Sequence, residues 1–243
     1  MSLSFKEQLS SAVQELSKYP TISYIDGYNL YFGVRWEAIK RGSRDLPDPG
    51  WYRYMWLDIS AMCKRLLSNQ QQLVAVKYFT SPITGNKAKQ DRQNAFLDAL
   101  RTFKEIEIIF GRFQNESRQC DRCGHSSFHP QEKKTDVNIA TNLICDALGD
   151  KYETALLVTA DSDIVPAIEA VKKFKPSKRI VVAFPPGRYS KELQNVAHAA
   201  IKIWDTHLRQ SRLPEIIKRE GLPDIVRPKK YSGEKNCTEE VKI

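Results

Sequence analysis

The segment L-L-V-T-A-D-S-D-I-V-P at residues 156–166 decides the fold. Its apolar first half has the composition of a buried strand, and Pro166 is tolerated in the first turn of a helix that follows. Asp161 and Asp163 stand between these two elements, one residue apart. Three interpretations fit this pair of acids: a helix cap, a metal site, or the nucleophile of a phosphotransfer reaction.

Apolar runs of the same kind recur along the chain and alternate with helical patterns. An unbroken apolar run indicates a strand buried on both faces, and alternation with helices is typical of a parallel sheet. The expected strands are 21–26, 73–80, 106–111, 153–159, 179–185 and a short 200–205. The expected helices are 5–18, 52–67, 87–103, one capped by Thr135, and 163–174. We therefore predict an α/β three-layer sandwich, with a central, mainly parallel sheet of about five to six strands and helices on both faces.

The remaining segments set the expected domain organisation. We predict one domain over residues 1–207, with an irregular stretch at 28–50 inside an aromatic and basic insertion at 28–56, and a cysteine-containing loop at 112–134. Residues 208–243 form a basic tail, in which LPEII at 213–217 is echoed by LPDIV at 222–226. Two copies are too few for a solenoid. The repeat is compatible with docking on the core or on the second subunit of a homodimer.

Aspartates mark the carboxyl ends of the first and fourth expected strands. Asp26 closes the first strand, with Asn29 just after a glycine turn, and Asp161 and Asp163 close the fourth. Asp136 begins the helix between the third and fourth strands. If these two strands are neighbours, as in doubly wound sheets, all four acids converge on one edge.

Four acids at one sheet edge favour a metal site over separate helix caps. Like charges at short range repel unless a cation lies between them, and sites built from oxygen ligands alone suit Mg²⁺ or Mn²⁺. A phosphatase of the haloacid-dehalogenase type is less favoured by position. Its aspartate nucleophile opens the site from the first strand with a second Asp two residues on, whereas this chain has D-G-Y there.

In order along the chain, four motifs resemble the NYN family of PIN-like nucleases, in particular its LabA-like branch. They are YIDGYNLYFG at 24–33, YMWLDI at 54–59, EKKTDVNIATNLICDA at 132–147 and LLVTADSDIVPAIEAV at 156–171. The resemblance covers most of the expected core, and the ordered set D-G-x-N, K-x-D-V-x-I-A and D-S-D is specific. A departure is Ile164, where the family often has an aromatic residue after D-S-D.

The resemblance implies a metal-dependent endoribonuclease on a PIN-like sheet. Carried over by position, the metal-binding and catalytic acids are Asp26, Asp136, Asp161 and Asp163, and Asn29 would orient Asp26 or a bound water. Mg²⁺ or Mn²⁺ would activate that water for phosphodiester hydrolysis. The residues proposed to contact the nucleic acid are Lys133, Lys134, Arg188 and Lys191. The alternative is an RNA- or protein-binding module that keeps the site but turns over poorly.

A second, separate metal site is suggested by C-D-R-C-G-H-S-S-F-H at 120–129. The C-x-x-C-G turn directs the thiolates of Cys120 and Cys123 at one point, as in zinc knuckles. His129 could supply a third ligand and His125 a fourth, which gives a structural Zn²⁺. The competing interpretations are reduced thiols in a loop and a disulfide formed on oxidation.

Composition and charge are compatible with a polyanionic partner, which the resemblance implies to be RNA, and we expect a cytoplasmic location. The net charge is +9, from 38 basic and 29 acidic residues, and a basic surface suits a polyanion. We find no secretion signal and no apolar segment long enough to span a membrane. Aromatic residues that could stack on unpaired bases lie in the insertion among arginines and lysines. They are Tyr28, Tyr31, Phe32, Trp36, Trp51, Tyr52, Tyr54 and Trp56.

Overall fold

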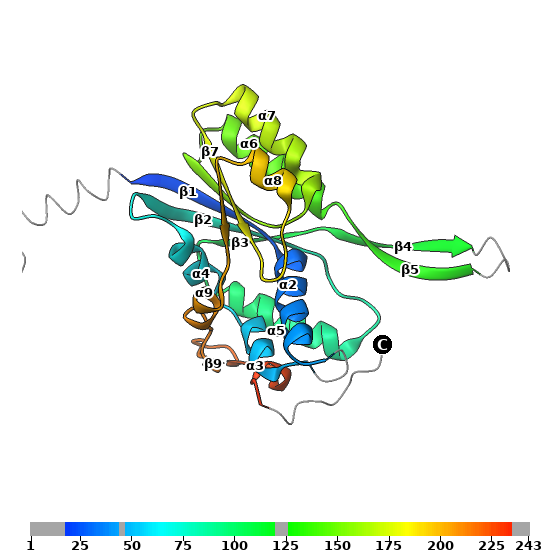
Figure 1. The fold of residues 1–243 in the computed structure, drawn as a ribbon. Helices are drawn as coiled ribbons and strands as arrows, with labels where there is room; N and C mark the ends of the chain where they lie inside the picture. Colours follow the sequence, from blue (N-terminus) through cyan, green and yellow to red (C-terminus); the bar gives the residue numbers. More distant parts are fainter. Residues whose placement is uncertain (1–17, 44–46, 120–125, 235–243) are drawn as a thin grey trace, which may run out of the picture.

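The centre of the protein is a six-stranded sheet in the order β3-β2-β1-β6-β7-β8 (Figure 1). The computed structural model describes residues 18–43, 47–119 and 126–234, and their side chains except those of 112–119 and 126–133. The strands are β1 (Tyr19–Asp26), β2 (Gln71–Thr80), β3 (Ile106–Phe110), β6 (Thr154–Val158), β7 (Arg179–Phe184) and β8 (Ala199–Lys202). Every neighbouring pair is parallel, so the predicted parallel sheet is confirmed.

Helices cover both faces of this sheet, which confirms the three-layer α/β sandwich (Figure 1). One face packs against α2 (Gly27–Arg41), α4 (Ile59–Leu66) and α5 (Lys87–Leu100), and the other against α6 (Thr135–Leu148), α7 (Val165–Phe174) and α8 (Lys191–Val196). Successive strand residues point to opposite faces, so Tyr24 enters one hydrophobic core and Ile25 the other.

The order of the strands creates a switch point between β1 and β6. From β1 the chain moves outward through β2 and β3, and after the hairpin described below it returns to β6 and moves outward the other way through β7 and β8. Ile25 pairs with Val158 in this central pair of strands. Ligands of open α/β sheets bind beyond the carboxyl ends of the strands at such a point.

The chain beyond residue 207 continues the core. After the short helix α9 (Asp205–Arg209), Leu213 donates its N–H to the Trp56 carbonyl at 3.1 Å, and the Trp56 indole donates to the Pro214 carbonyl at 2.7 Å. Ile225 and Tyr231 are buried in the same core. The small elements here are β9 (Ile216–Ile217), β10 (Ile225–Val226) and η3 (Lys229–Tyr231), and the repeated LPEII and LPDIV segments supply the two strands, which pair with each other. The segment expected to be a tail therefore lies on the core.

Two expectations about irregular segments were wrong. Residues 28–41 form helix α2, because an aromatic and basic segment with four-residue spacing has a helical period, and Asp26 caps that helix. The expected loop at 112–134 is an antiparallel hairpin of β4 (Arg112–Gln119) and β5 (Ser126–Lys133), which projects from the body of the molecule (Figure 1).

The expected helix at 52–67 is divided into shorter pieces. α3 (Pro49–Tyr52) and η1 (Arg53–Met55) precede α4, which begins only after the Asp58 cap. The expected helix at 5–18 falls almost wholly outside the described residues. None of the helices within the described ranges has the length and apolar character that crossing a membrane requires.

Candidate active site

Asp26 lies at the switch point, between the end of β1 and the start of α2. Its side chain is buried, and one carboxylate oxygen accepts a hydrogen bond from the Asn29 backbone N–H at 2.8 Å. The other oxygen accepts a hydrogen bond from the Thr159 hydroxyl at 3.1 Å. Asp26 is therefore a helix cap and is also held by the neighbouring strand end, which fixes its position in the site.

Thr159 also organises the D-S-D turn after β6. Its hydroxyl oxygen accepts a hydrogen bond from the Asp161 N–H at 3.1 Å. Asp161 in turn caps the single turn η2 (Ser162–Ile164) by accepting from the Asp163 N–H at 3.1 Å. Thr159 was not among the site residues expected from the sequence. The signal in the sequence that could have identified it is its position, because it is a hydroxyl residue at the end of the most apolar strand and just before the acids.

Asp136 approaches the same edge from the first turn of α6. Thr135, expected to cap this helix, is its first residue and is buried beside the Ser81 hydroxyl. The N-cap position belongs to Lys134, whose φ of 82° is in the left-handed region. This turn of the backbone ends the hairpin and begins α6, so that Asp136 follows two residues later.

The four acids share one electrostatic environment. Burial first, and then the charges of Asp161, Asp26 and Asp163, raise the pKa of the Asp136 carboxyl to about 6. None of the ion pairs formed by the described residues involves Asp136, Asp161 or Asp163. Asp136 is therefore repelled by the other three acids in the folded protein, and no described side chain forms an ion pair with it.

The donors fit a hard cation in their chemistry, but they do not form a closed chelate. Within the described part of the chain, no three Asp, Glu, His or Cys side chains stand together in a way that could hold a metal ion. Carboxylate oxygens are nevertheless the ligands that Mg²⁺ and Mn²⁺ prefer. A bound ion would therefore need at least one of these side chains to rotate.

Asn29 joins the site to Arg188, on the segment after β7. The Asn29 side-chain oxygen accepts hydrogen bonds from the Ala160 N–H at 3.3 Å and from an Arg188 guanidinium nitrogen at 3.4 Å. Its contact with Asp26 is made by the backbone N–H and not by the side chain. Arg188 Nε is buried and has no hydrogen-bond partner among the described residues.

Comparison with protein families gives a match over residues 21–234 to the model described as NYN domain. The match covers the sheet, the four acids and the segment packed after α9. The chain belongs to the NYN domain family. Its members have a nuclease-type domain, so the shared fold points to a nucleic acid substrate.

Two further proteins are similar to this NYN protein. The 6-hydroxy-3-succinoylpyridine 3-monooxygenase HspA of Pseudomonas putida is 25% identical, and the alignment covers 90% of this chain and 77% of that protein. A protein of unknown function from Vibrio parahaemolyticus, known from a crystal structure, is 18% identical with a TM-score of 0.47. That comparison covers 78% of this chain and 95% of the other.

The basic residues proposed to contact nucleic acid surround this NYN site unevenly. Arg188 lies in it, and Lys134 is exposed two residues before Asp136. Lys191 is the exposed first residue of α8, directly after the Ser190 cap. Lys133 ends β5, and its side chain lies outside those described.

The proposed zinc ligands fall on the hairpin of the NYN domain. Cys120, Cys123 and His125 lie outside the described residues. His129 is in β5, where it pairs with Glu116, and its side chain also lies outside those described. The zinc site therefore stays a prediction.

Six of the eight aromatic residues of the expected insertion are either buried or exposed, and the other two, Tyr28 and Tyr52, are half-buried. Trp51, Tyr54 and Trp56 are buried in the core, where Trp51 and Tyr54 pack edge to face. Tyr31, Phe32 and Trp36 are exposed on α2. Stacking on bases is thus open only to the exposed group among these six residues.

Proposed function

We propose that this NYN protein is a metal-dependent endoribonuclease, of the LabA-like branch, that cleaves single-stranded RNA in the cytoplasm. The observation that carries the proposal is the position of the acids at the switch point between β1 and β6, where burial and the charges of Asp161, Asp26 and Asp163 raise the pKa of Asp136. Such a concentration of negative charge, in a family with a nuclease-type domain, is what a site for divalent cations requires.

Asp26, Asp136, Asp161 and Asp163 would hold Mg²⁺ or Mn²⁺. A bound ion would supply an activated water and would stabilise the charge that develops on the phosphate during hydrolysis. The protein's own contribution is orientation. Thr159 and the start of α2 fix Asp26, and the D-S-D turn fixes Asp161 through the Asp163 N–H.

Arg188 is the residue best placed to bind the scissile phosphate. It already donates to Asn29 in the site, which holds its guanidinium at this end of the sheet. An arginine can offer two parallel donors to one phosphate, which fixes the orientation of the backbone. Lys134 and Lys191 would add positive charge on either side, as contacts to neighbouring phosphates.

The test is cleavage of end-labelled single-stranded RNA with Mn²⁺, with Mn²⁺ and EDTA, and by the Asp161→Asn variant. We expect cutting by the wild type that yields 5′-phosphate ends and is abolished by EDTA. We expect the variant to be slower by roughly a hundredfold or more. Asp150→Asn is the matched control, because Asp150 is an exposed acid paired with Lys175 and Lys178 away from these four acids. Intact RNA with wild-type protein would contradict the proposal.

Two alternative functions have their own outcomes in the same experiment. A binding module would retain RNA affinity in both the wild type and Asp161→Asn, with no cleavage in either. The relative named as a monooxygenase gives the other alternative, since it matches 90% of this chain. Consumption of NADH or NADPH with oxygen, in the presence of a hydroxypyridine, would favour an oxygenase over the nuclease.

A further inference from the structure

Helix α2 carries a row of aromatic side chains that begins beside the acidic site. Tyr28, Phe32 and Trp36 are spaced by four residues, so they lie along one side of the helix. The Tyr28 and Phe32 rings are stacked at 6.0 Å with 26° between their planes, and Tyr31 meets Phe32 edge to face at 5.3 Å. From Tyr28 to Trp36 the row is about 12 Å long.

Part of this row faces solvent instead of the core. Trp36 is 58% exposed, Phe32 39% and Tyr31 38%. Three large aromatic side chains on two turns of one helix form an apolar patch, and such patches mark binding surfaces more often than isolated exposed residues do. The opposite side of α2, with Leu30 and Val34, supplies the contacts with the core.

The segment after β7 fixes this aromatic face next to Arg188. A Cβ atom on Gly33 would lie 2.7 Å from the Pro186 carbonyl oxygen, so only glycine allows α2 and this segment to approach so closely. Gly187, at φ +66°, lies against the Trp36 ring and Glu37. Trp36 therefore packs against the segment that carries Arg188.

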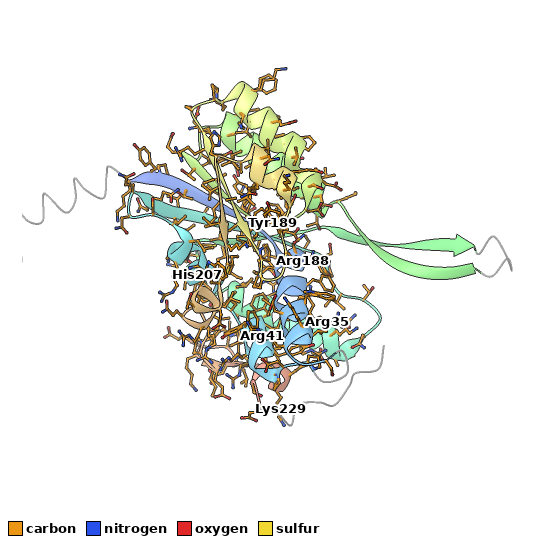
Figure 2. All side chains as sticks on the ribbon, viewed as in Figure 1. Arg35, Arg41, Arg188, Tyr189, His207 and Lys229 are labelled. Atoms are coloured by element: carbon orange, nitrogen blue, oxygen red, sulfur yellow. The ribbon has the colours of Figure 1, made fainter. Side chains whose placement is uncertain are left out.

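The charge around the aromatic face is positive. Arg35 is exposed on α2 beside this row, and Arg188 lies by the start of the helix (Figure 2). Glu37 is the only acid in α2, and it pairs with Arg41 at 3.6 Å. Aromatic faces combined with arginines are the means by which proteins bind unpaired nucleic acid bases and their phosphates.

We propose that the exposed face of α2, formed by Tyr31, Phe32 and Trp36, is a stacking platform for unpaired bases of the RNA strand that enters the acidic site. Arg35 and Arg188 would contact the phosphates of the same strand. This proposal rests on the proposed function, and it names the substrate as single-stranded, because the bases of a duplex are stacked on one another and cannot lie on the helix.

The test measures binding of fluorescein-labelled oligouridine by anisotropy, in EDTA and in the Asp161→Asn background, so that no RNA is cut. Phe32→Ala is compared with Phe174→Ala. Phe174 is also exposed and lies beside a lysine, but it is at the end of α7, at the opposite edge of the sheet. We expect Phe32→Ala and Trp36→Ala each to weaken binding by about tenfold. Phe174→Ala and Trp36→Phe should bind like the parent.

An abasic oligonucleotide separates stacking from charge. It keeps the phosphates and lacks the bases, so Trp36→Ala should bind it as the parent does, and Arg35→Gln should weaken its binding and lower the salt dependence. Equal affinity of Phe32→Ala, Trp36→Ala and Phe174→Ala for oligouridine would overturn the platform. The platform would also be overturned if Trp36→Ala lost as much affinity for the abasic strand as it loses for oligouridine.

The failure of the platform and the failure of the nuclease are distinguishable. If the wild type cuts RNA while the aromatic variants bind it normally, the platform is wrong and the nuclease stands. If the aromatic variants lose binding and the wild type never cuts, the platform stands on a protein that is not a nuclease.

Discussion

Helix α6 carries two aspartates whose surroundings are opposite. Asp146, near its end, accepts hydrogen bonds from Lys77 at 2.6 Å and from the Tyr24 hydroxyl at 2.8 Å, and it pairs with Lys151 at 3.0 Å. Burial raises the pKa of the Asp146 carboxyl, but these hydrogen bonds outweigh it and hold the pKa below its ordinary value. Asp136, in the first turn, has acids as its charged neighbours, and its pKa is raised to about 6.

The difference separates an acid that is paired within the fold from one that we propose to be functional. The group around Asp146 is complete, since Lys77 also donates to Asn142 at 2.8 Å, and it ties α6 to strands β1 and β2. Among the described side chains, no lysine or arginine pairs with Asp136 as Lys77 pairs with Asp146. A protein retains such repulsion where an external cation is to bind, which is why Asp136 and not Asp146 belongs to the candidate site.

The largest expected effect on stability comes from breaking the complete group. Asp146→Ala leaves Lys77 as a buried charge without its counter-ion, so the free energy of unfolding should fall by about 3–5 kcal/mol. Urea denaturation of the wild type and the variant measures it. A double variant, Lys77→Met with Asp146→Leu, should recover much of the loss. A small loss in the single variant would mean that the buried ion pair is not structural.

The second expected effect is a gain in stability on replacing Asp136, and its size depends on pH. Because folding raises the pKa of Asp136 from 3.8 to about 6, the folded protein binds a proton more tightly than the unfolded chain does. The stability that this proton contributes is present below about pH 4 and is lost as the pH rises through 6. In EDTA, Asp136→Asn should therefore be more stable than the wild type above pH 6, by at most about 3 kcal/mol before solvent screening.

This pH effect is read as a difference between two proteins, because other carboxylates titrate in the same range. Chemical denaturation at several pH values should show the stability gap between Asp136→Asn and the wild type opening between pH 4 and 6. A constant gap over that interval would show that Asp136 is not repelled in the folded state.

The smallest expected effect on stability is that of replacing Lys151, the exposed partner of Asp146. Lys151 also pairs with Asp146, but its side chain is largely exposed, and exposed ion pairs contribute little to stability. Lys151→Met should leave the urea midpoint within experimental error, in contrast with Asp146→Ala. A loss comparable to that of Asp146→Ala would place the stabilising charge at the surface and not in the buried pair.

Much of the fold follows from the sequence because buried parallel strands are unbroken apolar runs. The segments ending at Asp26 and before Asp161 were identified in this way, and their adjacency, confirmed by the pairing of Ile25 with Val158, places Thr159 within hydrogen-bond distance of Asp26. The predicted membership of the NYN family is confirmed by the match over residues 21–234.

Two segments were assigned the wrong secondary structure because their composition was given more weight than the spacing of their residues. Aromatic and basic residues at 28–41 suggested an irregular insertion, although their four-residue spacing is that of a helix face. The polar segment at 112–134 gave no apolar alternation, so the hairpin was taken for a loop. The Thr159 hydrogen bonds depend on the exact register of neighbouring strands, which a single sequence does not specify.

The most direct test of the central claim is a titration of the protein with Mn²⁺, followed by the loss of the free-ion signal in electron paramagnetic resonance. We predict binding by the wild type that is weakened by about tenfold or more in Asp136→Asn and Asp161→Asn. Asp150→Asn, which removes the same charge from the turn just after the far end of α6, should bind Mn²⁺ like the wild type. Equal binding by all four proteins, or none by the wild type, would contradict the assignment of the acidic edge as a cation site.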